Sequence, residues 1–165
     1  VYTNMVYGVK GIQWFTAGLA FETKPNGQAT PKLQKAGEDI TVLNKEIKVI
    51  GKTLVKLTSE KVFHTSPLPL GCSLVPMNSW VKTDAKNAIL GIFSGPKNET
   101  YLMVVNRDFQ NPNNISLDFD DSVSCVKLLD NKTGKWSTPV PENSRGGKVT
   151  LDLIGGDGAL MQVER

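Results

Sequence analysis

The sequence predicts a mainly β protein, an antiparallel β-sandwich preceded by one strand and one long amphipathic α-helix. Three observations predict this fold class. Residues 8–16 form a short, nearly continuous apolar segment, and residues 31–58 carry apolar side chains at helical spacing. After Ser59 the chain changes to short alternating segments broken by Pro, Gly and Asn, which is typical of antiparallel sandwiches. With 165 residues, of which 39% are hydrophobic, the chain is long enough to bury one core.

The predicted first strand covers residues 8–16, which read GVKGIQWFT. The segment is rich in β-branched and aromatic residues, and it is too continuously apolar for a strand that exposes one face to solvent. Such a composition suits a strand that is buried on both faces of a parallel sheet. A loop rich in Gly, Pro, Asn and Lys follows it.

The predicted helix covers residues 31–58. Thr30 directly precedes Pro31, a pairing of N-cap and first-turn residues that starts helices. The apolar side chains with helical spacing are Leu33, Ile40, Leu43, Ile47, Ile50, Leu54 and Leu57. The helix would be about 40 Å long. One strand and one helix cannot cover its apolar stripe. We therefore expect the helix to associate with a second copy, to fold back onto the sandwich, or to be poorly ordered.

The remainder of the chain predicts the strands of the sandwich. Residues 131–134 and 155–158 supply the positive-φ residues that tight hairpins need. The predicted strands are Val62–Thr65, Cys72–Val75, Ser79–Lys82, Ala88–Ser94, Thr100–Asn106, Ile115–Phe119, Val123–Leu129, Lys135–Val140, Lys148–Leu153 and Ala159–Val163. The chain thus divides into residues 1–60, the strand and helix, and residues 61–165, the sandwich.

Composition and charge exclude several classes of partner. The net charge is +3, and the lysines are scattered, so no basic stripe predicts binding to nucleic acid. No apolar run approaches the ~20 residues of a membrane span. The paired glycines at 146–147 and 155–156 do not open a helix, so they are turn residues and predict no nucleotide or other cofactor.

Metal binding is not predicted either. Cys72 and Cys125 are too few and too far apart for a zinc site, and they are either two buried thiols or one disulfide. Asp118, Asp120 and Asp121 form the densest acidic patch. Because Leu117 and Phe119 alternate with these acids, the period of two places the acids on the solvent face of a strand rather than around a calcium ion.

Several segments resemble a known family when taken in order. Residues 8–16, 27–31 (GQATP), 43–47 (LNKEI) and 50–54 (IGKTL) resemble the last strand and helix of the (β/α)₈ barrel in β-galactosidase-like glycoside hydrolases, particularly bacterial ones. The segments TYLMVVN at 100–106, LDNKTGK at 129–135 and GGDGALMQV at 155–163 are similar to the all-β domain that follows such barrels. The chain also opens on Val1 with no initiator Met, as expected of a C-terminal piece of a larger protein.

The resemblance implies a function in carbohydrate metabolism without catalysis by this chain. In these barrels the catalytic carboxylates end the fourth and seventh strands, whereas this chain resembles the part from the eighth strand onward. We therefore predict no catalytic residues here, a parent that is a glycosidase, and a periplasmic or secreted location for a bacterial parent. The catalytic barrel is the predicted partner. The alternative is a sandwich that binds carbohydrate independently of a barrel.

Two tryptophans are the predicted substrate-binding residues. Trp14 lies near the C-terminal end of the predicted first strand, where barrel loops build active sites, and its flat face matches the C–H face of a sugar ring. A packing role on the barrel or helix is the alternative. Trp136 follows a hairpin turn among polar neighbours, so it is the aromatic residue most expected to be exposed. The other aromatic candidates for a sugar platform, with a core position as the alternative, are Trp80, Tyr101 and Phe109.

The remaining ionisable residues have simpler explanations. Glu22 is expected to be a solvated loop acid, although a contact with substrate in the parent is the alternative. The helix acids Glu38, Asp39 and Glu46 lie among lysines, where pairing four residues apart explains them. His64 is the single histidine and has no serine, acid or cysteine partner signature, so we predict a structural role for it.

Overall fold

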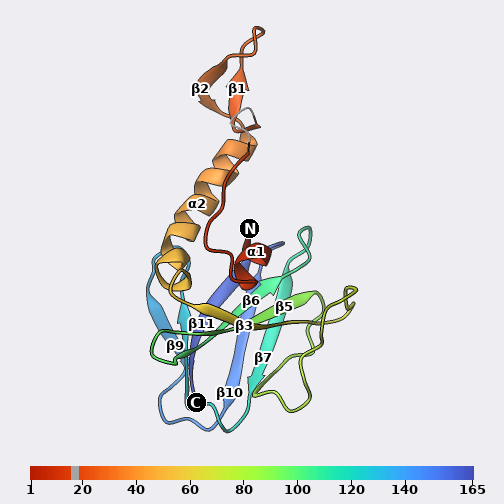
Figure 1. The fold of residues 1–165 in the computed structure, drawn as a ribbon, viewed down its shortest axis with the longest axis vertical. Coiled ribbons are helices and arrows are strands. Elements are labelled where there is room, and N and C mark those ends of the chain that lie inside the picture. The colour runs from red at the N-terminus through yellow and green to blue at the C-terminus, as the bar shows by residue number, and fades with distance from the viewer. Residues whose placement is uncertain (16–18) are drawn as a thin grey trace.

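A computed structural model describes residues 1–15 and 19–165 of the chain (Figure 1). A β-sandwich forms the body of the molecule, and a narrow arm projects from it. We define the arm as residues 9–15 and 19–46, which comprise an extended segment, a small hairpin and the first half of a long helix. The fold is mainly β with antiparallel sheets and one long helix, so the predicted fold class is confirmed.

The sandwich is built from two antiparallel sheets. The larger has six strands in the order β3-β5-β6-β11-β8-β9, and the smaller has three in the order β10-β7-β4. The six strands are β3 (Thr58–His64), β5 (Ala88–Ser94), β6 (Thr100–Asn106), β11 (Gly158–Glu164), β8 (Cys125–Leu129) and β9 (Trp136–Val140). The three are β10 (Gly147–Leu153), β7 (Asn113–Phe119) and β4 (Val81–Lys82).

The strand predictions in this region are confirmed with one exception. Predicted strands 88–94 and 100–106 coincide with β5 and β6, and the others differ only at their ends. Residues 72–75 do not form a strand, because Leu74 makes only an isolated bridge to His64. Three prolines, Pro67, Pro69 and Pro76, interrupt this part of the chain. Proline has no N–H to donate to a ladder, which leaves the segment as a loop that folds back onto β3.

The larger sheet is buried on both faces. Leu90, Leu102 and Val104 face the smaller sheet, whose Ile115 and Leu117 complete this first core. Their neighbours in sequence face the other way, because successive side chains of a strand point to opposite sides. These neighbours build a second core with the helices, which contains Ile89, Phe93, Met103, Val105 and Leu160.

Two helices cover the outer face of the larger sheet. Tyr2, Met5 and Val6 of the short helix α1 (Tyr2–Val6) are buried in the second core. The long helix α2 (Lys35–Leu54) adds Ile50 and Leu54 from its last turns. The C-terminal half of α2 therefore folds back onto the sandwich, one of the three outcomes expected for this helix. Neither helix among the described residues has the length and apolar character needed to cross a lipid bilayer.

The prediction of a strand over residues 8–16 is wrong for Gly8–Phe15, and Thr16 lies outside the described residues. The segment runs along α2 without any strand partner (Figure 1). A strand buried in a parallel sheet needs neighbours on both sides, and no other segment of residues 1–15 and 19–165 supplies them. The segment is held instead by Lys10. Its Nζ donates to the carbonyl oxygen of Leu54, the last residue of α2, at 2.9 Å, and to that of Leu57 in the turn that follows.

The prediction of a long helix is confirmed, but its bounds are shorter than 31–58. Thr30 and Pro31 belong to strand β2 (Ala29–Leu33), which pairs with β1 (Phe21–Thr23) in a two-stranded hairpin. The N-cap of α2 is Gln34 rather than Thr30. At the other end, α2 ends at Leu54, residues 55–57 form a turn, and Thr58 already begins β3.

Both cysteines are free thiols in the described structure, so the alternative of a disulfide is not realised. Cys125 is buried in β8, and Cys72 is half-buried in the loop that follows β3. The alternative of two buried thiols is therefore confirmed for Cys125, whereas Cys72 is a thiol that is only half-buried.

Candidate functional site

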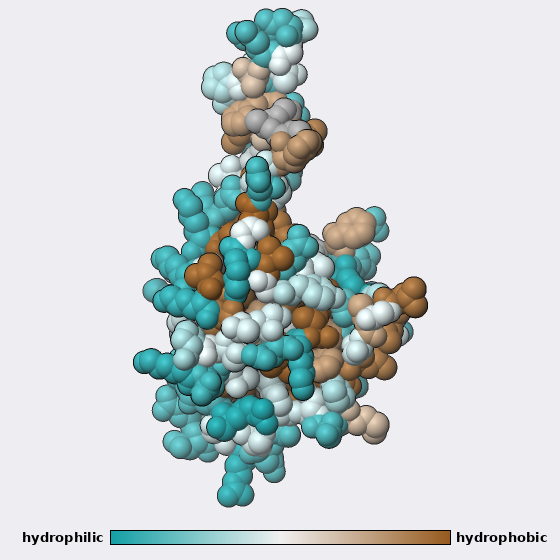
Figure 2. Space-filling view, in the orientation of Figure 1, coloured by the Kyte–Doolittle hydropathy of each residue, from teal (hydrophilic) through white to brown (hydrophobic). Residues whose placement is uncertain are grey.

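The arm carries apolar side chains that the described structure covers only in part or leaves accessible. We call Val9, Trp14, Phe15, Leu19 and Leu33 the apolar edge; all are exposed, and Phe15 is 97% accessible. Figure 2 shows brown side chains gathered on the arm, well away from the main body. Clustered exposed apolar groups mark interaction surfaces more often than isolated ones do. The apolar edge is therefore a candidate docking surface.

Trp14 is fixed on the side of α2. Its indole N–H donates to Asn44 Oδ1 at 3.1 Å, and 40% of its surface stays accessible. The ring thus has one anchored edge and a partly open face. This geometry is compatible with stacking on a sugar and with packing against another protein.

The apolar stripe of α2 is only partly filled beside the extended segment. Ile40, Leu43 and Ile47 are half-buried, whereas Ile50 and Leu54 are buried. A cavity of about 40 Å³ remains between residues 9–12 and the C-terminal half of α2. The chain therefore covers the end of the stripe near the sandwich well and its outer part poorly.

A wider cleft opens between α2 and the turn that joins β10 to β11. Its volume is about 570 Å³, and its apolar lining residues are Val1, Val42, Leu43 and Ile154. Its ionisable lining residues are Tyr2, Asp39, Glu46, Lys132, Asp152 and Asp157. The size suits a small ligand or a protruding element of another chain.

The acids of this cleft are held in place by neighbouring groups. The Tyr2 hydroxyl donates to Glu46 Oε2 at 2.8 Å. Burial, together with the hydrogen bond to Glu46, raises the pKa of Tyr2. Asp157 accepts the N–H of Gly158 at 2.7 Å, yet burial and the charge of Glu46 raise the pKa of its carboxyl. The cleft therefore holds negative charge that its own residues neutralise incompletely.

The second predicted tryptophan lies on another element. Trp136 begins β9, opposite Leu129, and is 40% accessible. The hairpin before it approaches α2 at Val49, since a Cβ added to Gly134 would lie 3.5 Å from Val49 Cγ1. Trp14 instead donates a hydrogen bond to Asn44 of α2, and no aromatic contact between the two tryptophans is found among the described residues.

The other aromatic candidates are dispersed. Trp80 is buried and stacks on Phe119, with ring centroids 6.1 Å apart, and the Arg165 guanidinium lies 5.3 Å from its centroid. Tyr101 is half-buried in β6, and Phe109 is exposed in the loop that follows β6. Trp80 therefore belongs to the core, which was the alternative stated for these aromatics.

His64 lies at the edge of the larger sheet. It is 5% accessible, and its Nε2 lies 2.7 Å from the Tyr7 hydroxyl. Its Nδ1 is buried and has no hydrogen-bond partner among residues 1–15 and 19–165. Burial, and secondarily the positive charge of Arg107, lower the pKa of His64. The contact ties the turn after α1 to β3, a structural arrangement.

Of the helix and loop acids singled out in the sequence, Glu22 and Asp39 have lysine partners among the described residues, whereas Glu38 and Glu46 do not form the predicted lysine pairs there. Glu22 pairs with Lys32 across the β1–β2 hairpin at 2.7 Å. Asp39 pairs with Lys35 four residues earlier on α2, as predicted. Sequence reasoning missed the role of Glu46, which contacts Tyr2 across 44 positions of the chain. No local pattern in the sequence signals this contact, because the two residues lie on different elements that only the fold brings together.

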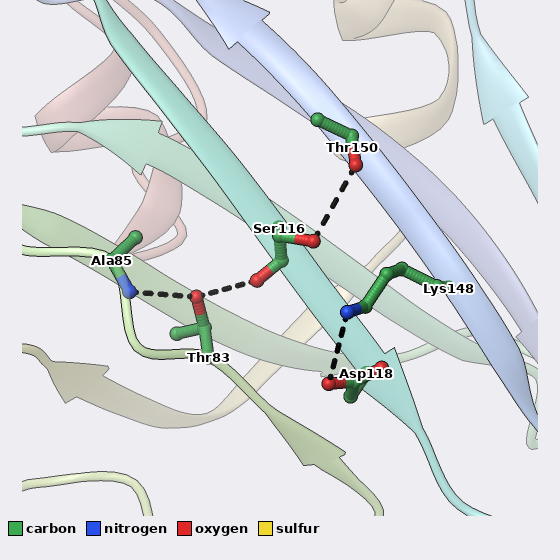
Figure 3. Close-up of polar contacts among 6 residues, drawn as sticks. All are labelled: Thr83, Ala85, Ser116, Asp118, Lys148 and Thr150. Carbon is green, nitrogen blue, oxygen red and sulfur yellow. Dashed lines mark hydrogen bonds and ion pairs between the residues drawn. The ribbon is translucent and has the colours of Figure 1, made fainter.

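The side chains on the outer face of the smaller sheet are polar, and they form hydrogen bonds and an ion pair with one another and with the backbone (Figure 3). Ser116 and Thr150 place their hydroxyls 3.4 Å apart, and the Thr83 hydroxyl donates to the carbonyl of Ser116 at 2.7 Å. Asp118 faces Lys148 at 3.6 Å. Asp118, Asp120 and Asp121 are exposed, as their alternation predicted, and the described residues contain no group of three or more His, Cys, Asp or Glu that could hold a metal ion.

Comparison of the chain with protein-family models, with curated proteins and with solved structures finds no match. The resemblance to β-galactosidase-like barrels thus remains a prediction from sequence segments, and the arm and the cleft are the geometric basis for a functional proposal.

Proposed function

We propose that this chain is a non-catalytic accessory region of a glycoside-hydrolase-like protein and that its arm packs against the catalytic barrel of that protein. The observation that carries the proposal is the apolar edge of the arm, where Trp14, Phe15 and Leu19 stay accessible. Burying a large apolar side chain contributes roughly 1.5–3 kcal/mol. A partner that covers the whole edge would gain several times that amount, less the cost of association.

The partly exposed apolar stripe of α2 also favours a barrel as the partner. The stripe formed by Ile40, Leu43 and Ile47 is half-covered, and it continues directly into the part of α2 that the sandwich buries. In a barrel, the last strand and helix would lie against neighbouring βα units, so residues 8–15 would gain the strand partners that they lack here. The barrel would thus cover both the segment and the stripe.

A structural rather than catalytic role fits the acids of the arm. Glycoside hydrolysis uses two carboxyl groups roughly 5–9.5 Å apart on either side of the bond. Glu22 and Asp39 are engaged by Lys32 and Lys35, and Glu46 is engaged by the Tyr2 hydroxyl. The isolated chain should not hydrolyse a chromogenic β-galactoside, and Glu46→Gln should leave that result unchanged.

The test is complementation of an incomplete barrel. A bacterial β-galactosidase truncated before its last βα unit is mixed with the chain, and complex formation is followed by size-exclusion chromatography. The complex should form with the unmodified chain and be lost with Phe15→Asp. Phe109→Asp is the matched control, because Phe109 is an exposed phenylalanine on a loop of the body. No complex, or equal loss with both variants, would reject the proposal.

The alternative is an independent carbohydrate-binding module, which is favoured by the accessible ring of Trp136 on β9. Glycan-array binding by the chain, with Trp136→Ala and Trp14→Ala beside it, separates the two functions. Binding that is lost with Trp136→Ala would support the module. Absence of binding at millimolar glycan would leave the accessory role.

A further inference from the structure

The backbone of residues 10–15 does not hold this segment in place. Among residues 1–15 and 19–165, no hydrogen bond to its N–H or C=O groups is found, so these groups are left to solvent. Two of its side chains, those of Lys10 and Trp14, form hydrogen bonds to α2. The position of the segment on the helix therefore depends on side chains.

The two side-chain anchors lie far apart along α2. Lys10 donates to the carbonyl oxygens of Leu54, at 2.9 Å, and Leu57. Trp14 donates to Asn44 Oδ1 at 3.1 Å, which is ten residues before Leu54. Ten residues of a helix span about 15 Å. The four steps from Lys10 to Trp14 span about 13–14 Å in a fully extended chain. The segment is therefore extended, and it runs antiparallel to α2 (Figure 1).

An extended chain points successive side chains to opposite sides, so the anchors determine which residues face the helix. Ile12 lies midway between the two anchors, is half-buried and lines the cavity beside α2. Gln13 and Phe15 alternate with the anchored side chains and are exposed, Phe15 at 97%. The even-numbered side chains of the segment thus face α2, whereas Gln13 and Phe15 face away from it.

The chemistry of Lys10 matches the end of the helix that it binds. The last carbonyl groups of a helix lack partners within the helix, and the helix dipole places partial negative charge on them. The ammonium group of Lys10 supplies both the donors and the opposite charge. Lys52, in the last turn of α2, is exposed, and its side chain forms no hydrogen bond or ion pair within the described part of the chain. Lys52 is therefore a matched control for the charge of Lys10.

We propose that Lys10 is the positioning residue of the apolar edge: its bonds to the end of α2 fix which side chains of residues 10–15 face the helix, so that Phe15 faces outward. A shift of the segment by one residue would exchange its two faces, because the side chains alternate. Phe15 would then lie against α2, and Trp14 would lose its bond to Asn44. The role of this position in docking rests on the proposed function, whereas the position itself is measured in the chain alone.

The first test follows the indole N–H signal of Trp14 by NMR in the intact chain. Asn44→Ala gives the reference position of the signal without the hydrogen bond. Lys10→Met should move the signal to that position, whereas Lys10→Arg should keep the original signal, because a guanidinium group also donates to carbonyls. Lys52→Met removes the same charge from the same helix end and should have no effect. A signal that stays in place in Lys10→Met would overturn the inference.

The second test moves the ammonium group by one residue. The double variant Lys10→Gly, Gly11→Lys keeps the charge, and a Cβ added at Gly11 would meet nothing within 4 Å. Because the new lysine starts from the opposite side of the chain, the Trp14 signal should stay at the position that it has in Asn44→Ala. Return of the original signal would mean that the charge alone is sufficient, and it would overturn the inference. Circular dichroism confirms that each variant is folded.

The third test measures docking to the truncated β-galactosidase. Lys10→Met should raise the dissociation constant of the complex by about tenfold, because the freed segment must be ordered on binding. Lys10→Arg should restore most of the affinity, and Lys52→Met should leave it unchanged. Equal affinity of Lys10→Met and the unmodified chain would overturn the inference and leave the proposed function standing. If the unmodified chain forms no complex, the proposed function fails, and the indole signal still decides whether Lys10 positions the segment.

Discussion

The sandwich and the arm differ in how completely their apolar side chains are buried by other residues of the chain. In the sandwich, both faces of the six-stranded sheet are covered, one by the smaller sheet and one by α1 and the end of α2. In the arm, the strand β2 is exposed at most positions, and the apolar edge is only partly covered by the described residues. Apolar segments thus reach different degrees of burial in the two regions, because the described residues supply a complementary surface for the sandwich and only a partial one for the arm.

The difference has a local cause in each region. The strands of the sandwich all pair antiparallel, some through a short turn, as β5 pairs with β6, and others with strands far away in sequence, as β6 pairs with β11. The segment 8–15 has the composition of a central parallel strand, which requires crossover partners of another kind. Without these partners, its apolar side chains stay accessible along α2.

The largest expected effect separates a core leucine from an arm leucine. Leu90→Ala removes a fully buried side chain from between the sheets and should lower the free energy of unfolding by about 2–5 kcal/mol. Leu19→Ala is the same chemical change on the exposed edge and should stay within about 0.5 kcal/mol. Urea unfolding followed by circular dichroism measures both. Comparable losses would mean that the arm has a core of its own.

Replacing a glycine by alanine should lower the stability in the sandwich, at Gly91, and raise it in the long helix, at Gly51. A Cβ at Gly91 in β5 would lie 2.6 Å from the Val6 carbonyl oxygen, so Gly91→Ala should separate α1 from the sheet and lose about 1–3 kcal/mol. At Gly51 in α2 a Cβ would meet nothing within 4 Å. Gly51→Ala should therefore gain about 0.5–1 kcal/mol from helix propensity. Thermal unfolding of both variants is the measurement. A lower stability of Gly51→Ala would mean that the added methyl group clashes with a neighbouring group.

Prediction from sequence succeeded where the signal was local. The alternation and turn residues around 88–94 and 100–106 located β5 and β6, and the helical spacing located α2. It failed at residues 8–15, because a buried-strand pattern needs partners that the local pattern does not guarantee. Thr30 and Pro31 carry a helix-start signal, yet the pairing of Phe21 with Leu33 places them in a hairpin.

The candidate site was harder to predict than the fold. The exposure of Trp136 was indicated by its polar neighbours, whereas Trp14 was selected for its place in a predicted strand that does not form, and the cleft depends on contacts between distant segments. Glu46 acquires its orientation from Tyr2, and Asp157 acquires its shifted pKa from burial and from Glu46. No local pattern connects these residues, because the fold of the whole sandwich brings the turn between β10 and β11 to α2.

A pH titration examines the junction between the N-terminal segment and the sandwich. The pKa of His64 lies below its usual 6.5 because of burial and Arg107, so the unfolded chain takes up a proton first as the pH falls. Stability from this group is fully present above pH 6.5 and is lost as the pH falls toward the lowered pKa. His64→Gln should weaken the loss of stability between pH 7.5 and 5.5 in urea titrations. An unchanged pH dependence would assign the loss to other groups.

The smallest effect should come from the ion pair of the arm. Lys32 and Glu22 meet at 2.7 Å across the β1–β2 hairpin, and both side chains are exposed, so water and salt screen the pair. Glu22→Gln should leave the urea midpoint of the whole chain unchanged within error. Hydrogen exchange should instead quicken at the hairpin amides alone, because the hairpin opens without the sandwich. A shift of the global midpoint would mean that arm and sandwich unfold as one unit, and the contrast between them would then concern exposure only.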